Sequence, residues 1–245
     1  MKHTENYTVR WHDTDAAREM RPSALMALMQ ETSHMQFLQG GRTLDSIRDE
    51  QGVGFILSRI ALDVLRMPRA YESLRIETFT CKGHGYTFPR GFEAYCGDEL
   101  VARCHSLWAL VRIDGHSLVR VADFPLSFGD EPEALTDMPI RVRAPRDLVY
   151  RPVGERRIVW SDLDYNLHMN NTKYPDMVCD FLPYPEALRV VGISFDFCRE
   201  AAFGDLLVVE RADAGDGVFY FRTRKGEEIC LQAMVCTAPR TESQQ

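Results

Sequence analysis

The chain has 245 residues, of which 45% are hydrophobic, enough apolar material for one large domain or two of ordinary size. Its formal net charge of -7 argues against nucleic acid as the main partner, because phosphate binding needs a basic surface. No run of about 18 uncharged apolar residues exists, and residues 1–10 are polar. We therefore expect no membrane span, no secretory signal and a cytoplasmic location. The seven cysteines form no Cys-x-x-Cys pair, which predicts reduced thiols without a disulfide framework or a structural zinc site.

The first half opens on a polar motif, Trp-x-Asp-x-Asp at residues 11–15, and a helix is predicted after it. The helix is expected near residues 22–38, because Pro22 suits an early helical position and apolar side chains recur at helical spacing, namely Leu25, Leu28 and Met29, with Thr32 on the same face. Strand-like runs follow at residues 55–65, 73–82, 87–95 and 100–113. One helix beside such strands indicates an α+β unit.

Residues 124–157 are predicted to form a linker. They hold five of the twelve prolines, and that density favours an extended connection. They also hold six arginines, so residues 141–157 carry a local charge of +4 within an acidic chain. We expect this stretch to be a solvated surface.

The second half repeats the plan of the first. Trp-x-Asp-x-Asp recurs at residues 160–164, and a helix is expected from about Asn171, capped by Asn170 or Asn171. Its apolar face would consist of Tyr174, Met177, Val178, Phe181 and Leu182. Pro175 is tolerable in the first turn, where amides lack intrahelical partners. Strand-like runs follow at residues 190–198, 205–211, 217–224 and 229–237.

Three blocks match between the halves in the same order, which indicates a duplicated domain. Residues 9–15 match 158–164, residues 63–66 match 196–199, and residues 97–101 match 226–230. The sequence thus predicts an N-terminal domain at residues 1–123 and a C-terminal domain at residues 158–245. Residues shared by both copies are interpreted as structural, and those found in one copy as candidates for function.

Three polar residues occur only in the second copy. Asn166, His168 and Glu200 stand where the first copy has Ala17, Glu19 and Met67, whereas Asp164 has a counterpart in Asp15. If the chain stays extended, Asp164, Asn166 and His168 project to one side, just before a helix amino terminus. Backbone amides there, at Asn170, Asn171 and Thr172, could hold an oxyanion. A carboxylate with His, Asn and such amides can activate water.

Residues 163–174, LDYNLHMNNTKY, with residues 197–200, FCRE, resemble the signature of the acyl-acyl-carrier-protein thioesterases of plants and bacteria. Residues 28–32, LMQET, and 106–108, SLW, resemble that family's amino-terminal domain. The resemblance implies a tandem (double) hotdog fold, with each half an antiparallel sheet wrapped around a long central helix. It also implies hydrolysis of fatty acyl thioesters without a cofactor. The partner would be acyl carrier protein with its acylated phosphopantetheine arm.

Carried over residue by residue, the motif assigns Asp164, Asn166, His168 and Glu200 to the active site. The family often has cysteine directly after the glutamate, whereas this chain has Ala201, so a cysteine nucleophile at that place is impossible. No sequence feature shows that Cys198 replaces it. We expect Glu200 to take a proton from water, Asn166 and His168 to position water and the thioester carbonyl, and Asp164 to orient its neighbours.

Other interpretations stay open at this stage. Asp162, Asp164 and His168 could bind a metal, although their spacing matches no known metal loop. Met26 and Met29 are candidates for an acyl pocket, because flexible methionines suit one. The arginine-rich linker could attract the acidic carrier protein. An acyl-CoA thioesterase, a hotdog dehydratase and a non-catalytic acyl-binding protein are the rival functions, and the chain could be a monomer or a homodimer.

Overall fold

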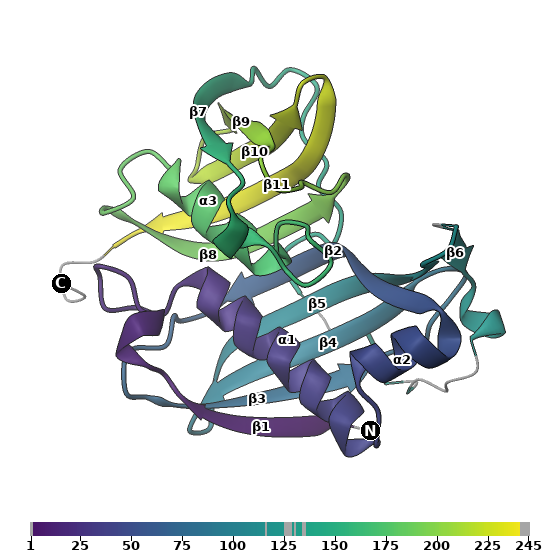
Figure 1. Cartoon of the computed structure of the whole chain (residues 1–245). Helices are drawn as coiled ribbons and strands as arrows, with labels where there is room; N and C mark the ends of the chain where they lie inside the picture. Colours follow the sequence, from purple (N-terminus) through teal and green to yellow (C-terminus); the bar gives the residue numbers. More distant parts are fainter. Residues whose placement is uncertain (1, 116, 125–128, 130, 134–135, 241–245) are drawn as a thin grey trace.

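The structure, a computed structural model, describes residues 2–115, 117–124, 129, 131–133 and 136–240. In Figure 1 the second half lies above the first, and in each half a helix packs against one face of a curved part of the sheet. The first half contains β1 (His3–Thr8), the 3-10 turn η1 (Trp11–Asp13), α1 (Pro22–Gln39), α2 (Leu44–Gln51), β2 (Val53–Val64), β3 (Ser73–Thr80), β4 (Phe88–Cys96), β5 (Glu99–Arg112), β6 (Leu118–Val119) and η2 (Val121–Asp123). The second half contains β7 (Arg151–Arg157), η3 (Trp160–Asp162), η4 (Asn171–Lys173), α3 (Tyr174–Asp180), β8 (Leu188–Phe197), β9 (Leu206–Asp213), β10 (Val218–Lys225) and β11 (Glu228–Pro239).

The strands of both halves join in one antiparallel sheet. Its order is β1-β3-β4-β5-β2-β8-β11-β10-β9-β7, with the short β6 paired to β5. The order reads the same from either end once each strand is exchanged for its repeat, β1 for β7, β3 for β9, β4 for β10, β5 for β11 and β2 for β8. The sheet topology therefore confirms the duplication, and each of the eight predicted strands is present.

Individual hydrogen bonds repeat as well. The amide of Met20 donates to the carbonyl of Pro68, and the amide of Met169 donates in the same way to Ala201. The bond from Arg21 to Asp13 recurs between Asn170 and Asp162, and the bond from Val9 to Glu72 recurs between Ile158 and Asp205. Both copies therefore use the same backbone framework, and differences between them lie in side chains and insertions.

The halves meet where β2 pairs with β8. Ala61 lies opposite Ser194, and the paired positions run from Arg59 with Asp196 to Asp63 with Gly192. Because residues 63–66 match residues 196–199, Ala61 and Ser194 are each other's repeat. This pair consequently marks a local two-fold axis between the halves.

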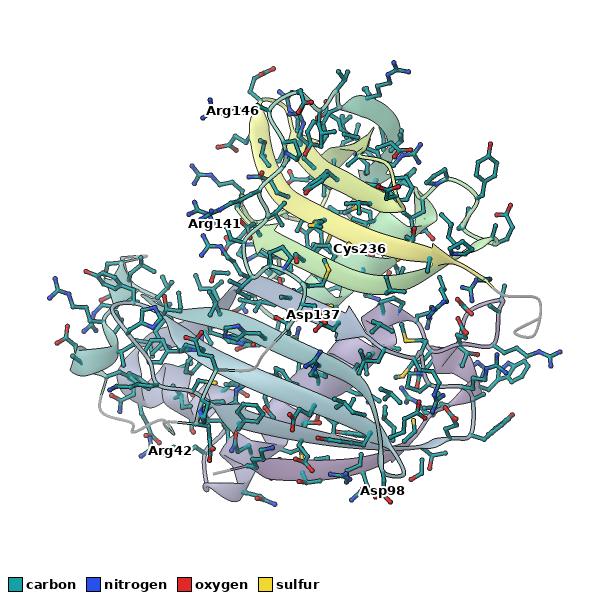
Figure 2. The ribbon with its side chains drawn as sticks, turned by 180° about the vertical axis from the view of Figure 1, so that it is seen from behind. Arg42, Asp98, Asp137, Arg141, Arg146 and Cys236 are labelled. Carbon is teal, nitrogen blue, oxygen red and sulfur yellow. The ribbon has the colours of Figure 1, made fainter. Side chains whose placement is uncertain are left out.

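The linker crosses this junction on the outer face of the sheet, as Figure 2 shows from behind for Asp137 and Arg141. Asp63 accepts hydrogen bonds from the amides of Asp137 (2.8 Å) and Met138 (2.9 Å), and its repeat, Asp196, accepts one from Val142 (3.3 Å). Farther along, Val142 packs with Ala212 and Tyr220 on the outer face of the second sheet. Residues 137–142 of the linker thus cover the junction, held there by these hydrogen bonds, and Arg141 is exposed on their surface.

Two sequence expectations need correction. Arg151–Arg157, assigned to the linker, is strand β7, which pairs with β9 as β1 pairs with β3. The central helix of the second half is short rather than long, because a 3-10 turn precedes it and the seven-residue α3 ends at Asp180. Pro183 and Pro185 follow closely, and a residue before proline avoids the helical conformation. The predicted apolar face continues beyond the helix, where Leu182 is buried.

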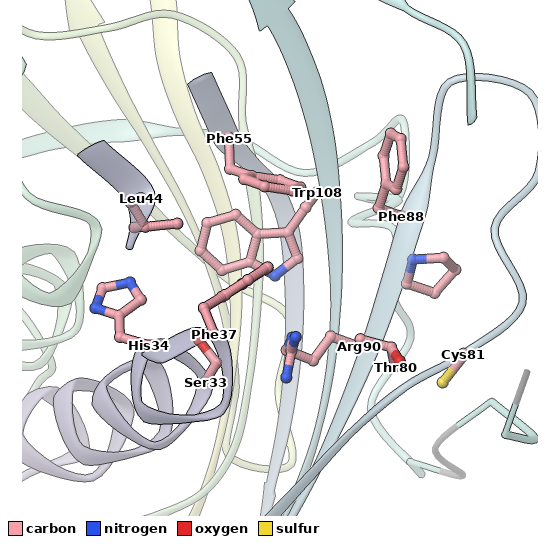
Figure 3. A pocket seen from close by; sticks show the side chains of 11 residues that line it. Ser33, His34, Phe37, Leu44, Phe55, Thr80, Cys81, Phe88, Arg90 and Trp108 are labelled. Atoms are coloured by element: carbon pink, nitrogen blue, oxygen red, sulfur yellow. The ribbon is translucent and has the colours of Figure 1, made fainter. Parts of the chain in front are cut away.

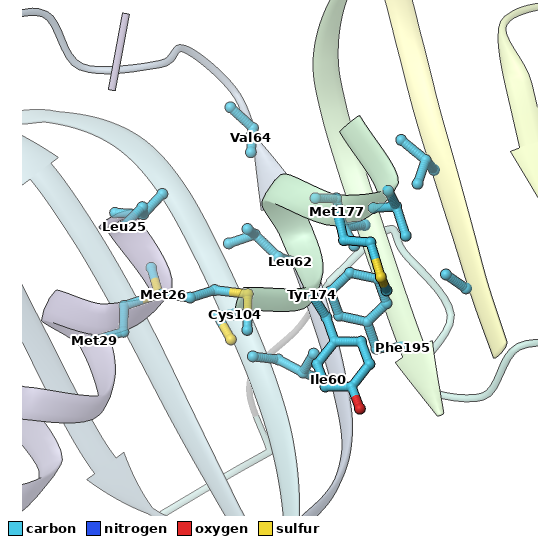
Figure 4. Close-up of a cluster of buried hydrophobic side chains, with 14 of the residues drawn as sticks. Leu25, Met26, Met29, Ile60, Leu62, Val64, Cys104, Tyr174, Met177 and Phe195 are labelled. Carbon is cyan, nitrogen blue, oxygen red and sulfur yellow. The ribbon is translucent and has the colours of Figure 1, made fainter. Parts of the chain in front are cut away.

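A single apolar core extends through both halves. Figure 4 shows side chains of α1 and β2 in the first half next to Tyr174, Met177 and Phe195 of the second. Leu62 is fully buried in this cluster. Among the described residues, no helix is both long enough and apolar enough to cross a bilayer.

Leu62→Ala should lower the free energy of unfolding by about 2–5 kcal/mol, because it leaves a cavity in the shared core. Leu65→Ala is the control, since Leu65 is 46% exposed, and it should change stability by about 0.5 kcal/mol or less. Urea unfolding followed by tryptophan fluorescence measures both, and Trp11, Trp108 and Trp160 report on the two halves. We expect one shared transition; equal losses in the two variants would contradict this view of the core.

Candidate active site

Asp164 builds a tight turn that carries the polar residues of the second copy. Its Oδ1 accepts hydrogen bonds from the amides of Asn166 (2.9 Å) and His168 (3.3 Å). Within the same turn, the amide of Leu167 donates to the carbonyl of Asp164, and the amide of Asp164 donates to His168. Leu167 takes a left-handed φ of +66° to close it. Asp164 therefore fixes the backbone from which Asn166 and His168 project.

The condition under which Asp164, Asn166 and His168 would project to one side, an extended chain through residues 164–168, is not met. An aspartate side chain can bond to amides two and four residues ahead, and this local bonding outcompetes the extended strand. The side chain of Asp164 consequently points into the turn. Its backbone contacts agree with the orienting role expected for it.

His168 and Glu200 are brought together from distant parts of the chain. The backbone of His168 forms an antiparallel bridge with Ala202, just beyond Glu200. The side chains meet with His168 Nε2 3.2 Å from Glu200 Oε2. Both remain partly open to solvent, with 36% of the His168 side chain and 58% of the Glu200 side chain exposed. Water can therefore reach the pair directly.

The matching turn of the first copy has the same backbone and different chemistry. Asp15 accepts hydrogen bonds from the amides of Ala17 (2.8 Å) and Glu19 (3.2 Å), and Arg18 takes a φ of +63°. Glu19, the counterpart of His168, forms an ion pair with Arg240 instead. The first copy thus preserves the turn and closes it with a salt bridge.

Two of the three amides predicted to hold an oxyanion are already occupied. The amide of Asn170 donates to the carbonyl of Asp162, and the amide of Thr172 donates to Asn170 Oδ1 at 2.9 Å. Asn170 is thus the cap of η4, as its residue type suggested. Of the three, only the amide of Asn171 has no hydrogen bond to another described residue.

The side chain of Asn166 contacts the first half of the protein. Arg48, on α2, donates a hydrogen bond of 3.0 Å from Nη1 to Asn166 Oδ1. Its guanidinium also lies 5.8 Å from the centre of the Tyr165 ring. The sequence comparison missed this contact because α2 has no counterpart in the second copy. The sequence does signal the start of helix α2 itself, since residues 43–46 read Thr-x-x-Ser, a combination that can cap a helix.

Asp162 has a structural role, as its counterpart Asp13 suggested. It is 2% exposed and accepts hydrogen bonds from Arg156 (2.6 Å) and from the amide of Val159 (3.0 Å). Asp13 is also held by an arginine, since Arg10 donates to it from both Nε (2.7 Å) and Nη2 (3.0 Å). Within the described part of the chain, no three His, Cys, Asp or Glu side chains are grouped closely enough to bind a metal ion.

A narrow apolar cavity of about 40 Å³ lies in the first half, between the end of α1, the start of α2 and the sheet. Figure 3 shows its lining. The walls are Ser33, His34, Phe37, Leu44, Phe55, Thr80, Cys81, Phe88, Pro89, Arg90 and Trp108. Met26 and Met29, the residues suggested by sequence, are not among them and lie in the core nearer the start of α1.

Two polar side chains of the cavity are adapted to this apolar setting. Burial lowers the pKa of His34, which keeps its imidazole neutral at neutral pH. Burial also lowers the pKa of Arg90 to about 10. Arg90 remains charged and donates hydrogen bonds to Gln36 Oε1 (2.6 Å) and Thr78 Oγ1 (3.0 Å). The cavity therefore presents mainly hydrocarbon to a ligand.

Comparison with protein families gives matches over both halves. The acyl-ACP thioesterase N-terminal domain matches residues 1–125, and the acyl-ACP thioesterase C-terminal domain matches residues 153–231. The chloroplastic oleoyl-acyl carrier protein thioesterase of Coriandrum sativum is 23% identical over 233 residues, which cover 84% of this chain. This chain spans only 61% of the length of that relative.

Solved structures show the same fold. An acyl-ACP thioesterase from Bacteroides thetaiotaomicron superposes with a TM-score of 0.86 at 18% identity, covering 97% of this chain and 98% of the other. The 12:0-ACP thioesterase from Umbellularia californica gives a TM-score of 0.82 at 19% identity, covering 98% of each chain. The expected tandem hotdog fold is confirmed.

Asp164→Ala and Asp15→Ala should each destabilise the protein by about 1–3 kcal/mol, because each removes a charged acceptor from two backbone amides. Asp15→Ala should cost slightly more, since Asp15 Oδ2 also accepts a hydrogen bond of 3.3 Å from Arg240. Asparagine at either position keeps an acceptor oxygen and should recover part of the loss. Ser161→Ala, at an exposed neighbouring position, serves as the control. Chemical denaturation measures all five variants. A large difference between the two alanine variants would mean that the turns are not energetically equivalent.

Proposed function

The chain belongs to the acyl-ACP thioesterase family, and from that premise we propose that it hydrolyses fatty acyl carrier protein and releases the free fatty acid. One observation carries the assignment to residues. His168 and Glu200 pair at 3.2 Å beside the turn that presents Asn166, and the first copy has neither member of this pair. This pair supports a reaction site in the second half.

Glu200 acts as the general base. One carboxylate oxygen, Oε2, contacts His168 Nε2, which leaves Oε1 to accept a proton from water. The water oxygen bonds to the thioester carbon as that proton transfers, and the carbonyl oxygen becomes negatively charged. The Nδ2–H group of Asn166 donates to this oxyanion. When the tetrahedral intermediate collapses, the carbon–sulfur bond breaks and the proton on Glu200 returns to the leaving sulfur.

A thioester needs little acid assistance at this last step. The leaving thiol has a pKa of about 8.5, far below that of an alcohol. The thiolate therefore leaves readily, and no strong proton donor is needed. One partly exposed His–Glu pair can thus serve the whole reaction.

Cys198 is not the nucleophile in this mechanism. Partial burial raises the pKa of its thiol, which opposes the thiolate form. Its sulfur lies 3.8 Å from Gln232 Nε2 and 3.5 Å from the carbonyl oxygen of Asp196. Cys198 comes directly after the end of β8, and among the described residues none of its hydrogen bonds involves His168 or Glu200.

Glu200→Gln should lower kcat about 100-fold or more, because it removes the base while keeping size and most hydrogen bonds. Cys198→Ala should keep the wild-type rate. Of the two destabilised turn variants, only Asp164→Ala should slow hydrolysis, since Asp15 supports no reacting group. Release of free thiol from palmitoyl carrier protein provides the assay. Full activity in Glu200→Gln together with loss in Cys198→Ala would overturn the mechanism.

The cavity beside α2 receives part of the acyl chain; at about 40 Å³ it must widen to take a whole fatty acyl chain. Leu44 lines it, and Arg48, one helical turn later, contacts Asn166, so α2 connects the cavity to the turn that presents the catalytic groups. Its apolar walls suit a hydrocarbon chain, and the buried Arg90 sets a polar boundary. Chain length is then selected by the first half, while the second half performs the reaction.

Ser33→Leu, which narrows the cavity, and Trp108→Ala, which widens it, should shift the released acids in opposite directions, towards shorter and longer chains. Met26→Ala and Met29→Ala are the controls; they should lower stability without changing the chain profile, because neither residue lines the cavity. The measurement is mass spectrometry of acids released from carrier-protein substrates of eight to eighteen carbons, with matched CoA thioesters alongside. An unchanged profile in both cavity variants would place the chain elsewhere, and preference for CoA would assign the protein a different substrate.

A further inference from the structure

Three residues on one face of helix α2 each contact a different part of the protein. Leu44 lines the cavity, Ile47 is 1% exposed in an aromatic cluster of the first half, and Arg48 reaches Asn166. Both ends of the helix are fixed, by the reciprocal hydrogen bonds between Thr43 and Ser46 and by Gly52 in the left-handed region at φ +64°. Arg48 therefore stands on a rigid support.

The contact determines which way the Asn166 amide faces. Arginine carries only hydrogen-bond donors, so the atom that meets Arg48 Nη1 at 3.0 Å must be the amide oxygen. Nδ2, on the same planar group, must then point away from Arg48. The two amide orientations of an asparagine without such a neighbour are close in energy; this charged donor selects one.

We propose that Arg48 is a positioning residue of the active site, which holds the Asn166 amide so that its Nδ2–H group is directed at the thioester oxygen. The inference rests on the proposed function and adds to it a contribution from the first half. A charged donor on the amide oxygen also polarises the group, which strengthens the opposite N–H as a donor. Arg48 thus acts through Asn166 and does not need to touch the substrate.

The asymmetry between the copies fits this role. Helix α2 occurs only in the first half of the described chain, and Ala17, the counterpart of Asn166, has no side-chain amide for such a helix to orient. The insertion and the asparagine are thus found together at one site. They lie on different halves, so the site is complete only when both halves are assembled.

The test is a double-mutant cycle between Arg48 and Asn166. Arg48→Ala should lower kcat about 10-fold, less than the loss of an oxyanion donor itself, with KM changed by no more than about twofold. In the Asn166→Ala background, Arg48→Ala should have no further effect on kcat. Arg48→Lys should recover part of the rate, because lysine also donates. Asp49→Ala, an exposed change on the same helix, is the control for helix stability and should behave as wild type.

The outcomes distinguish a failure of the positioning role of Arg48 from a failure of the proposed function. If Asn166→Ala loses activity while Arg48→Ala keeps full kcat, the positioning role is wrong and the proposed function stands. If Arg48→Ala lowers kcat equally in both backgrounds, or raises only KM, Arg48 acts independently of Asn166 and the inference is overturned. If Asn166→Ala itself keeps full activity, the proposed role of Asn166 fails and the inference fails with it. Melting temperatures matched to Asp49→Ala exclude a general loss of folding as the cause.

Discussion

The pairing of β2 with β8 is the constraint on which the rest of the structure depends. It joins two sheets into one, places the local two-fold axis at Ala61 and Ser194, and allows one apolar core to cross between the halves. Linker residues then cover the junction, where their backbone amides donate hydrogen bonds to the matched aspartates Asp63 and Asp196. Because the halves are fixed in this way, a residue of the first half can contribute to a turn of the second with a fixed geometry. A loosely tethered pair of domains could not hold the contact between Arg48 and Asn166.

The sequence was most informative where local physics decides the structure. Local sequence patterns predicted the strands and the helix that starts at Pro22. The Trp-x-Asp-x-Asp motif occurs in both copies, so each prediction for one half could be checked against the other. Comparison of the copies also separated Asp162, a buried partner of Arg156, from His168 and Glu200, which meet at 3.2 Å. That separation needed no coordinates, because the first copy retains the framework and lacks the pair.

The sequence was least informative where a side chain competes with the backbone or where two distant segments meet. Asp164 folds its own carboxylate onto the turn, so the alternation of residues 164–168 no longer defines a face. Thr172 gives its amide to Asn170 instead of to a ligand. β7 is rich in arginine and contains Pro152, so its sequence resembles a linker; its strand conformation depends on pairing with β9. The role of Arg48 could not be predicted, because nothing in the sequence around it indicates that Asn166 will lie beside it.

If the proposed function holds, duplication explains how one fold can both bind an acyl chain and hydrolyse its thioester. The offset between matched residues falls from 149 at Asp15 and Asp164 to 133 at Asp63 and Asp196, so the first copy holds 16 more residues in this interval. Those residues account for the additional length of α1 and for the whole of α2, and both helices border the cavity. In the first copy, Glu19 of the turn forms an ion pair with Arg240. In the second copy, His168 and Glu200 remain partly exposed to water. The insertion that builds the cavity also supplies Arg48, so on this proposal the acyl chain and the reacting carbonyl are positioned by the same helix.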